Sequence, residues 1–173
     1  MKLHLGRLGI ARHRSKQHRE LVKLSIEADT TGNTPDDRAT YAHAFERKTD
    51  LAYTSLTRDF DILRARNADT REFTNYVRLA IDRFIYPTLN KDTKKDLFEI
   101  AQAVGMLQAI FNCALEEVFK DQRLFKEFHL CMSRLRTIKE LDITPLKHLL
   151  DTYDGDVLTY KYRDEWNQIV RLF

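Results

Sequence analysis

The chain has 173 residues, 43% of them hydrophobic, and a net charge of +3, which fits one folded domain and excludes an intrinsically disordered chain. Its five glycines and three prolines are too few for the tight turns of a β-sandwich or barrel, so the composition favours helices. Two cysteines, Cys113 and Cys131, cannot form the disulfide framework of a small secreted domain, which favours an intracellular, reducing compartment.

Positive charge is concentrated at the start of the chain. Residues 1–23 contain seven Lys and Arg residues and one acidic residue, whereas the rest of the chain contains 22 and 25. The seven cations are Lys2, Arg7, Arg12, Arg14, Lys16, Arg19 and Lys23. Gly6 and Gly9 disfavour a regular helix before Ile10, so the sequence predicts an extended basic arm followed by a helix over residues 11–28.

This predicted helix places four cations on one face, because Arg12, Lys16, Arg19 and Lys23 follow one another at steps of four, three and four. Such a face could dock into an acidic groove on another protein, with apolar anchors supplied by the arm. The anchors are Leu3, Leu5, Leu8 and Ile10. Alternatively, the cations could follow a nucleic-acid backbone through phosphate contacts, since no aromatic residue lies before residue 24 to stack on bases. A solvated tail or a membrane-surface helix is the third alternative.

No segment predicts secretion or a membrane span. Met1–Ile10 has no continuous apolar region, so we expect no Sec-type signal peptide. The longest uncharged stretch, Ile100–Leu115, carries Gln102, Gln108 and Asn112 and is shorter than the roughly 18 to 20 apolar residues that span a bilayer. We expect this stretch to form the most buried helix of the core.

The body of the protein is predicted to start with two long helices. Thr34 and Pro35 suit the N-cap and the first position of a helix, and apolar residues at helical spacing continue to about Arg66. A second helix is predicted to end at Tyr86, because Pro87 should stop it. The short connection between them makes these helices antiparallel neighbours.

The next helices form the centre of the predicted bundle. A third long stripe predicts a central helix over Leu97–Val118. We prefer a break near Asp121, which suits an N-cap, over one bent helix that continues to Ile138.

The last third of the chain predicts shorter elements. Thr144 and Pro145 suit the start of a short helix, and a final helix is expected over Asp164–Leu172. Val157–Tyr162 is the only stretch with strand propensity. The sequence therefore predicts an all-α fold: a basic N-terminal arm and helix over residues 1–28, and a single helical bundle of about five to seven helices over residues 29–173.

Two sequence patterns resemble metal sites, and both lack required ligands. His43 and Glu46 have the reverse order of the Glu-x-x-His pair of a di-metal bundle, and no second pair accompanies them. Asp151, Asp154 and Asp156 surround a glycine, but the spacing is not that of a calcium loop and no glutamate closes it. We interpret the first as an exposed polar pair and the second as turn chemistry.

The remaining polar residues of interest also favour structural roles. Cys131 lies on an apolar stripe, and His129, two residues away on a helix, points in another direction, so core packing is preferred over a thiol nucleophile. Gln108 and Asn112 are interpreted as a buried polar pair that sets helix register. We assign an ordinary structural role to the three carboxylates that flank the central helix, which are Glu99, Glu116 and Glu117.

The sequence thus predicts no catalytic residues, no metal site, no cofactor and no small-molecule substrate. We expect a non-enzymatic structural or assembly subunit of a larger complex, whose basic arm docks on another protein subunit. The alternative is a nucleic-acid-binding accessory protein that contacts phosphates through the Arg12, Lys16, Arg19 and Lys23 stripe.

Overall fold

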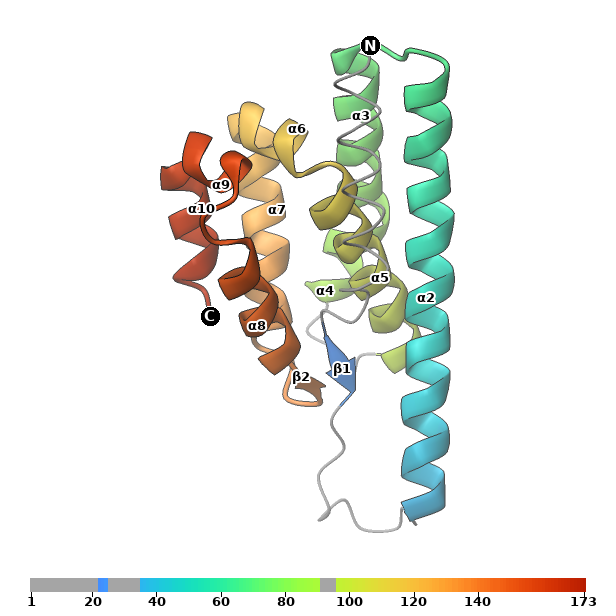
Figure 1. Cartoon of the computed structure of the whole chain (residues 1–173). Helices are drawn as coiled ribbons and strands as arrows, with labels where there is room; N and C mark the ends of the chain where they lie inside the picture. Colours follow the sequence, from blue (N-terminus) through green and yellow to red (C-terminus); the bar gives the residue numbers. More distant parts are fainter. Residues whose placement is uncertain (1–21, 25–34, 91–95) are drawn as a thin grey trace.

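The computed structural model describes residues 22–24, 35–90 and 96–173 of the chain. These residues form a mostly helical bundle, in which six helices have eight residues or more (Figure 1). The predicted all-α fold is therefore confirmed. The elements are β1 (Lys23–Leu24), α2 (Pro35–Ala65), α3 (Thr70–Ala80), a π-helical segment η1 (Ile81–Ile85), α4 (Tyr86–Leu89), α5 (Leu97–Cys113), α6 (Leu115–Lys120), α7 (Gln122–Leu135), β2 (Leu141–Asp142), α8 (Thr144–Tyr153), α9 (Val157–Lys161) and α10 (Arg163–Val170).

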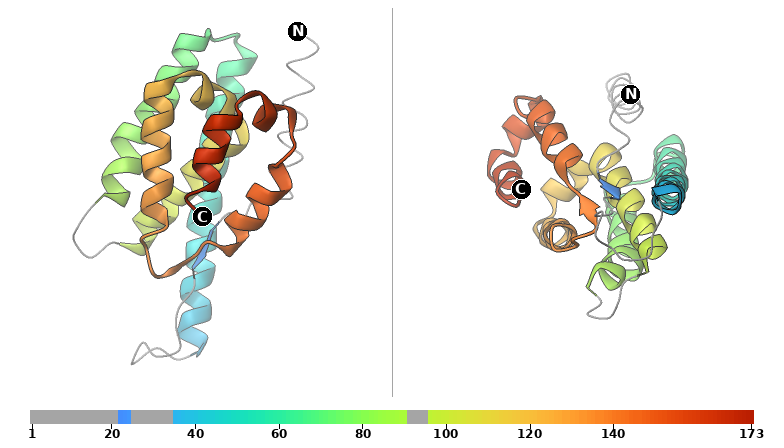
Figure 2. Two further views of the ribbon diagram at one scale, coloured as in Figure 1. Left: turned by 90° about the vertical axis from the view of Figure 1, so that its left-hand side faces the viewer. Right: turned by 90° about the horizontal axis from the view of Figure 1, so that it is seen from below.

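Helices α2 and α5 make the most extensive contact in the bundle and run side by side in the same direction (Figure 1). The helix predicted from Pro35 is confirmed as α2, which extends alone below the bundle at its N-terminal end (Figure 2). Gly105 of α5 allows the close approach, because a Cβ atom there would lie 2.2 Å from the carbonyl oxygen of Thr49. The two backbones can touch only where α5 has no side chain.

Helix α3 runs antiparallel to α2, as the sequence predicts (Figure 1). Aromatic side chains of α3 contact the C-terminal half of α2. The rings of Phe60 and Phe73 have centroids 5.2 Å apart, and the Tyr76 hydroxyl donates to Asp59 at 2.6 Å. The predicted stop at Pro87 is wrong, since the helical rod continues through η1 and α4 to Leu89. The π-helical turns change the hydrogen-bond register, so Pro87 falls in the first turn of α4, where its missing N–H breaks no bond.

The predicted central helix Leu97–Val118 is interrupted. Its core, α5, is the most buried helix, but Ala114 leaves the helical region with φ −133° and ψ 16°, and α6 starts at the next residue. Arg64 of α2 donates a hydrogen bond of 2.5 Å to the Cys113 carbonyl at this break. The predicted break at Asp121 is confirmed, because its carboxylate accepts from the Leu124 N–H at 3.1 Å and caps α7.

The helix predicted over residues 11–28 is wrong at Lys23 and Leu24, which form β1 and pair antiparallel with β2. The rest of that prediction lies mostly outside the described residues. Val22 is buried in the core and Leu24 packs against the same core, and their separation of two residues is that of side chains on one face of a strand. A sheet of only two short strands is stable here because β1 also lies against α2.

The strand propensity of Val157–Tyr162 is not realised, because these residues form α9 and its C-cap. Asp156 accepts from the Leu158 N–H at 3.2 Å and caps the helix, and no partner strand is available nearby in the described part of the chain. The predicted last helix is confirmed as α10, which contacts α7 and buries Trp166, whose ring centroid lies 6.2 Å from that of Phe111 in α5.

The buried side chains of β1, β2 and the helices form one continuous hydrophobic core. Among the residues that the structure describes, no helix combines the length and the apolar character needed to cross a membrane. Both cysteines are free thiols.

Candidate functional site

The predicted basic site lies mostly outside the described residues. The six cations there are Lys2, Arg7, Arg12, Arg14, Lys16 and Arg19. Lys23 is described, and it lies in β1 opposite Asp142. A hydrogen bond from the Thr144 N–H, 3.0 Å long, lowers the pKa of Asp142, and the charge of Lys23 adds to this shift. Lys23 therefore follows strand geometry and does not continue a helical stripe of cations.

The segment before β1 is joined to the bundle at Val22. This side chain is 4% exposed and belongs to the main core. Lys23 and Leu24 then pair with β2, whose Leu141 is also buried. The chain between residues 22 and 24 is thus held by both core packing and backbone hydrogen bonds.

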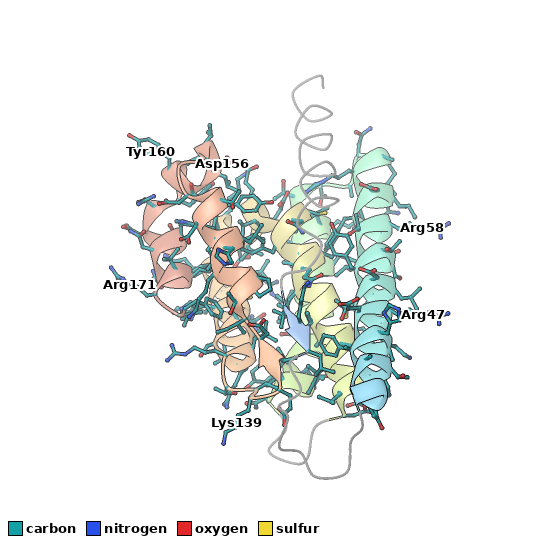
Figure 3. All side chains as sticks on the ribbon, turned by 60° about the horizontal axis from the view of Figure 1, so that its bottom comes forward. Arg47, Arg58, Lys139, Asp156, Tyr160 and Arg171 are labelled. Carbon is teal, nitrogen blue, oxygen red and sulfur yellow. The ribbon has the colours of Figure 1, made fainter. Side chains whose placement is uncertain are left out.

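One face of α2 points away from the bundle. The residues on it follow one another at steps of three or four and are Thr40, Ala44, Arg47, Leu51, Ser55, Arg58, Ile62 and Ala65. We call the section from Arg47 to Ile62 the α2 outer face. Leu51 is 63% and Ile62 is 55% exposed, and Arg47 and Arg58 project outward on the same side (Figure 3).

The fully exposed charged side chains of the α2 outer face are basic. Arg47, Lys48 and Arg58 are exposed, whereas every acidic residue between positions 39 and 65 is half-buried toward the flanks of the helix. These acidic residues are Glu46, Asp50, Asp59 and Asp61. The sequence did not single out this face, because cations and acids are interleaved along α2 and only burial separates them.

A second exposed surface lies on the opposite side of the molecule, where α8, α9 and α10 meet (Figure 3). Val157 is 74% and Tyr160 is 81% exposed, and both belong to the short helix α9. Residues 151–165 contain five acidic and two basic side chains. We call this surface the α9 corner and define it by Asp151, Asp154, Asp156, Val157, Tyr160 and Asp164.

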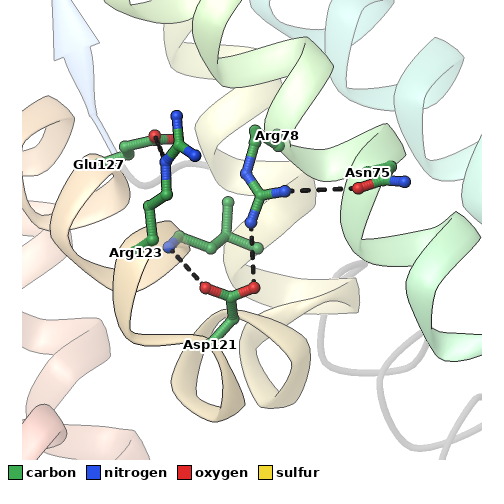
Figure 4. A network of polar contacts seen from close by, with 6 residues as sticks. Asn75, Arg78, Asp121, Arg123 and Glu127 are labelled. Carbon is green, nitrogen blue, oxygen red and sulfur yellow. Dashed lines mark hydrogen bonds and ion pairs between the residues drawn. The ribbon is translucent and has the colours of Figure 1, made fainter.

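A network of charged side chains joins α3 to α7 (Figure 4). Arg78 donates to Asp121 at 3.0 Å and to Asn75 at 3.3 Å, and Arg123 lies 3.4 Å from Glu127. The hydrogen bond from the Leu124 N–H lowers the pKa of Asp121, and Arg78 contributes to the same shift. This network fixes the start of α7 against α3.

Glu127 also interacts with Asp82 of η1. Partial burial raises the pKa of Glu127, and the neighbouring Asp82 raises it further through its charge and a hydrogen bond. The protonated form of Glu127 is favoured because its ionised form is repelled by the charge of Asp82. The sequence could not reveal this pair, because its members come from elements far apart in the chain.

Cys131 is the nearest potential nucleophile to these carboxyl groups. It is fully buried, and burial together with the charges of Glu127 and Asp82 raises the pKa of its thiol to about 12. The thiol therefore stays protonated at neutral pH and cannot act as a thiolate. This environment favours the core-packing interpretation of Cys131. His129 instead lies 3.2 Å from the Gln168 carbonyl of α10.

Arg64 and Glu117 form a partly buried ion pair between α2 and α6, with an N–O distance of 3.3 Å. Burial raises the pKa of Glu117, and the charge of Arg64 opposes this shift. The Arg64 guanidinium also lies 4.3 Å from the centroid of the Phe73 ring. Of the other two carboxylates from the sequence, Glu116 pairs with Lys120 and Glu99 is exposed.

The predicted buried polar pair is only partly confirmed. Gln108 is buried, and Asn112 is half-buried, but the Asn112 side chain accepts a hydrogen bond from the Tyr153 hydroxyl of α8 at 3.1 Å. The side-chain nitrogen and oxygen of Gln108 have no hydrogen-bond partner. Asn112 thus connects α5 to α8, whereas Gln108 makes no comparable bond.

The two metal-like sequence patterns gain no further ligands within the described ranges. In residues 22–24, 35–90 and 96–173, no three His, Cys, Asp or Glu side chains gather where they could hold a metal ion. Asp154 bonds Arg163 at 2.6 Å, Asp156 caps α9, and Gly155 between them has a φ of 91°. These residues therefore have the geometry of a turn followed by a helix cap.

Comparison with known proteins found no matching protein-family model, no matching curated protein and no matching solved structure. The functional argument therefore rests on the residues of this chain.

Proposed function

We propose that the protein is a non-enzymatic structural subunit of a larger assembly, and that its basic N-terminal segment docks on a partner protein. The observation that carries this proposal is the attachment of the segment at β1. Val22 is buried in the core, and Lys23 and Leu24 pair with β2, so the preceding cations are presented from a defined position on the bundle. A positioned basic segment with apolar residues suits docking on an acidic protein surface.

The environments of the ionisable groups support a structural role. Perturbed pKa values often mark catalytic residues, but they also arise in structural networks. Here Glu117 pairs with Arg64, and Asp121 caps a helix and pairs with Arg78. The Tyr76 pKa is raised to about 12, first by burial and then by the hydrogen bond to Asp59. Each of these groups joins two elements of the bundle.

The proposal is tested with two variants of the basic segment. One replaces apolar anchors and keeps the charge (Leu3→Ser, Leu5→Ser and Leu8→Ser), and the other removes charge and keeps the anchors (Arg12→Ala, Lys16→Ala and Arg19→Ala). Lysine-reactive crosslinking in the source cells, read by mass spectrometry, should join Lys2 or Lys16 of the unaltered chain to one partner protein. The apolar variant should lose this crosslink while its circular dichroism spectrum stays unchanged.

A crosslink that persists in the apolar variant would remove the anchors from the proposed site. A variant that unfolds would show instead that the opening segment is part of the core. Loss of the Lys2 crosslink in the charge variant alone, which keeps Lys2, would assign docking to electrostatics.

The alternative is a nucleic-acid-binding accessory protein, and the seven Lys and Arg residues among residues 1–23 favour it. This alternative predicts that the chain binds duplex DNA or RNA of random sequence with an affinity that falls steeply with salt. The Arg12, Lys16 and Arg19 variant should then reduce the slope of log affinity against log salt by about 3.

A further inference from the structure

The α2 outer face and the α9 corner are complementary in charge and similar in apolar content. Arg47 and Arg58 lie about 16 Å apart along α2, with Leu51 and small Ser55 between them and Ile62 beyond. The α9 corner presents Val157 and Tyr160 within residues 151–165, which hold five acidic and two basic side chains, and Asp154 and Arg163 of this segment pair with each other. Leu51 and Ile62 are the most exposed large apolar side chains of α2, and Val157 and Tyr160 are those of α9. The two surfaces lie on opposite sides of the bundle (Figure 3).

We propose that the α2 outer face of one molecule binds the α9 corner of a second copy, so that copies of this chain join head to tail. This inference rests on the proposed function as an assembly subunit and names one of its partners. Val157 and Tyr160, three residues apart on one face of α9, pack against Leu51 and Ile62. The carboxylates of the same segment lie opposite Arg47 and Arg58.

Charge decides against the two symmetric pairings of these surfaces. Two α2 outer faces packed together would bring Arg47 and Arg58 of both copies into one seam, where no acidic side chain is fully exposed on the described part of the helix. Two α9 corners packed together would gather ten acidic side chains against four basic ones, since each contributes five and two. Like charges face each other in both cases, whereas the head-to-tail contact pairs opposite charges.

The apolar residues decide against nucleic acid as the occupant of the α2 outer face. Leu51 and Ile62 lie in the same row as the two arginines and would be pressed against phosphates. A protein surface with its own apolar residues satisfies both kinds of side chain on this face.

The contact joins two different surfaces, so it is heterologous. After pairing, one molecule keeps a free α9 corner and the other keeps a free α2 outer face, so growth continues until a ring closes or a filament forms. Because α9 has only five residues, the contact is small and belongs to the weak class of interfaces. Its dependence on exposed charges means that association weakens as salt increases.

Sedimentation equilibrium of the full chain and two surface variants tests this inference. The α2 variant carries Arg47→Glu and Arg58→Glu, and the α9 variant carries Val157→Ser and Tyr160→Ser; all four side chains are exposed, so the fold should be retained. A matched control carries Lys126→Glu and Lys139→Glu, which make the same change in net charge at exposed sites elsewhere. The unaltered chain and the control should reach masses above the dimer as concentration rises at low salt.

Each variant alone should associate at least about tenfold more weakly than the unaltered chain. An equimolar mixture of the two variants should form a dimer and nothing larger, because it contains one intact α9 corner and one intact α2 outer face for each pair of molecules. This result is specific to a head-to-tail contact.

Three results would overturn the inference: a monomeric unaltered chain at concentrations up to about 1 mM, an α9 variant that associates as the unaltered chain does, or a mixture that yields no dimer. None of them affects the crosslink between the N-terminal segment and its partner, which tests the proposed function separately. Loss of that crosslink with self-association intact would leave the head-to-tail contact standing and remove the role of the arm.

Discussion

Gln108 carries an uncompensated polar group in the middle of α5. Its side chain is 1% exposed, and neither its amide nitrogen nor its amide oxygen has a hydrogen-bond partner. An amide that loses its bonds to water without replacing them costs about 1 to 3 kcal/mol. Asn112, one turn further along, accepts the Tyr153 hydroxyl with its amide oxygen, although its amide nitrogen also lacks a partner. The Gln108 amide is therefore the less satisfied of the two.

Gln108→Met should raise the free energy of unfolding by about 1 kcal/mol, because methionine has nearly the same length and removes the buried amide. Urea denaturation monitored by circular dichroism measures this change. The matched variant Asn112→Leu should lower the free energy of unfolding, since it leaves the Tyr153 hydroxyl without its acceptor. A less stable Gln108→Met protein would show that the amide is hydrogen-bonded in solution.

At the scale of the elements, the carboxyl pair of Asp82 and Glu127 couples η1 to α7. The folded protein keeps the Glu127 carboxyl protonated to a higher pH than the unfolded chain does, because burial and Asp82 raise its pKa. The stability that the protonated pair contributes is thus present below the ordinary glutamate pKa. It is lost as the pH rises through the raised pKa of the folded protein.

Glu127→Gln should remove this pH dependence, because an amide donates to Asp82 at every pH. The Tm of the Glu127→Gln variant minus the Tm of the unaltered protein should therefore increase as the pH rises from about 4 to about 8. Differential scanning fluorimetry across this range measures it, and Asp82→Asn should behave in the same way. Parallel Tm curves for all three proteins would show that the two carboxyl groups titrate independently.

At the scale of the whole molecule, β1 joins the basic segment to the bundle. Val22 belongs to the same core as the buried residues of α5, α7 and α10. Its burial therefore links the position of the segment to the stability of the body.

Val22→Ala should lower the free energy of unfolding by about 2 kcal/mol, through the lost burial of two methyl groups and the space left behind. The neighbouring Lys23→Gln, which changes charge without changing the core, should lower it by less than about 0.5 kcal/mol. Chemical denaturation of both variants gives the comparison. An unchanged Val22→Ala protein would mean that β1 does not hold the segment on the bundle.

The sequence by itself determined the helical class and the start of most long helices. Pro35, Asp121 and Pro145 act through their own backbone and the next few residues, so the signals that begin α2, α7 and α8 are local. The burial of α5 follows equally from the absence of charged residues between Ile100 and Cys113. The dense cations before residue 24 are also visible in the sequence, although only Lys23 among them lies in the described part of the chain.

Only the tertiary structure decided the features that depend on residues distant in the chain. Ala114 breaks α5 where Arg64 of α2 binds the Cys113 carbonyl, and β1 exists because Leu141 and Asp142 pair with it. The carboxyl pair on η1 and α7, the α2 outer face and the α9 corner likewise arise when packing buries some side chains and exposes others. Local sequence patterns contain no information on those partners, because each contact is made only after the helices have assembled.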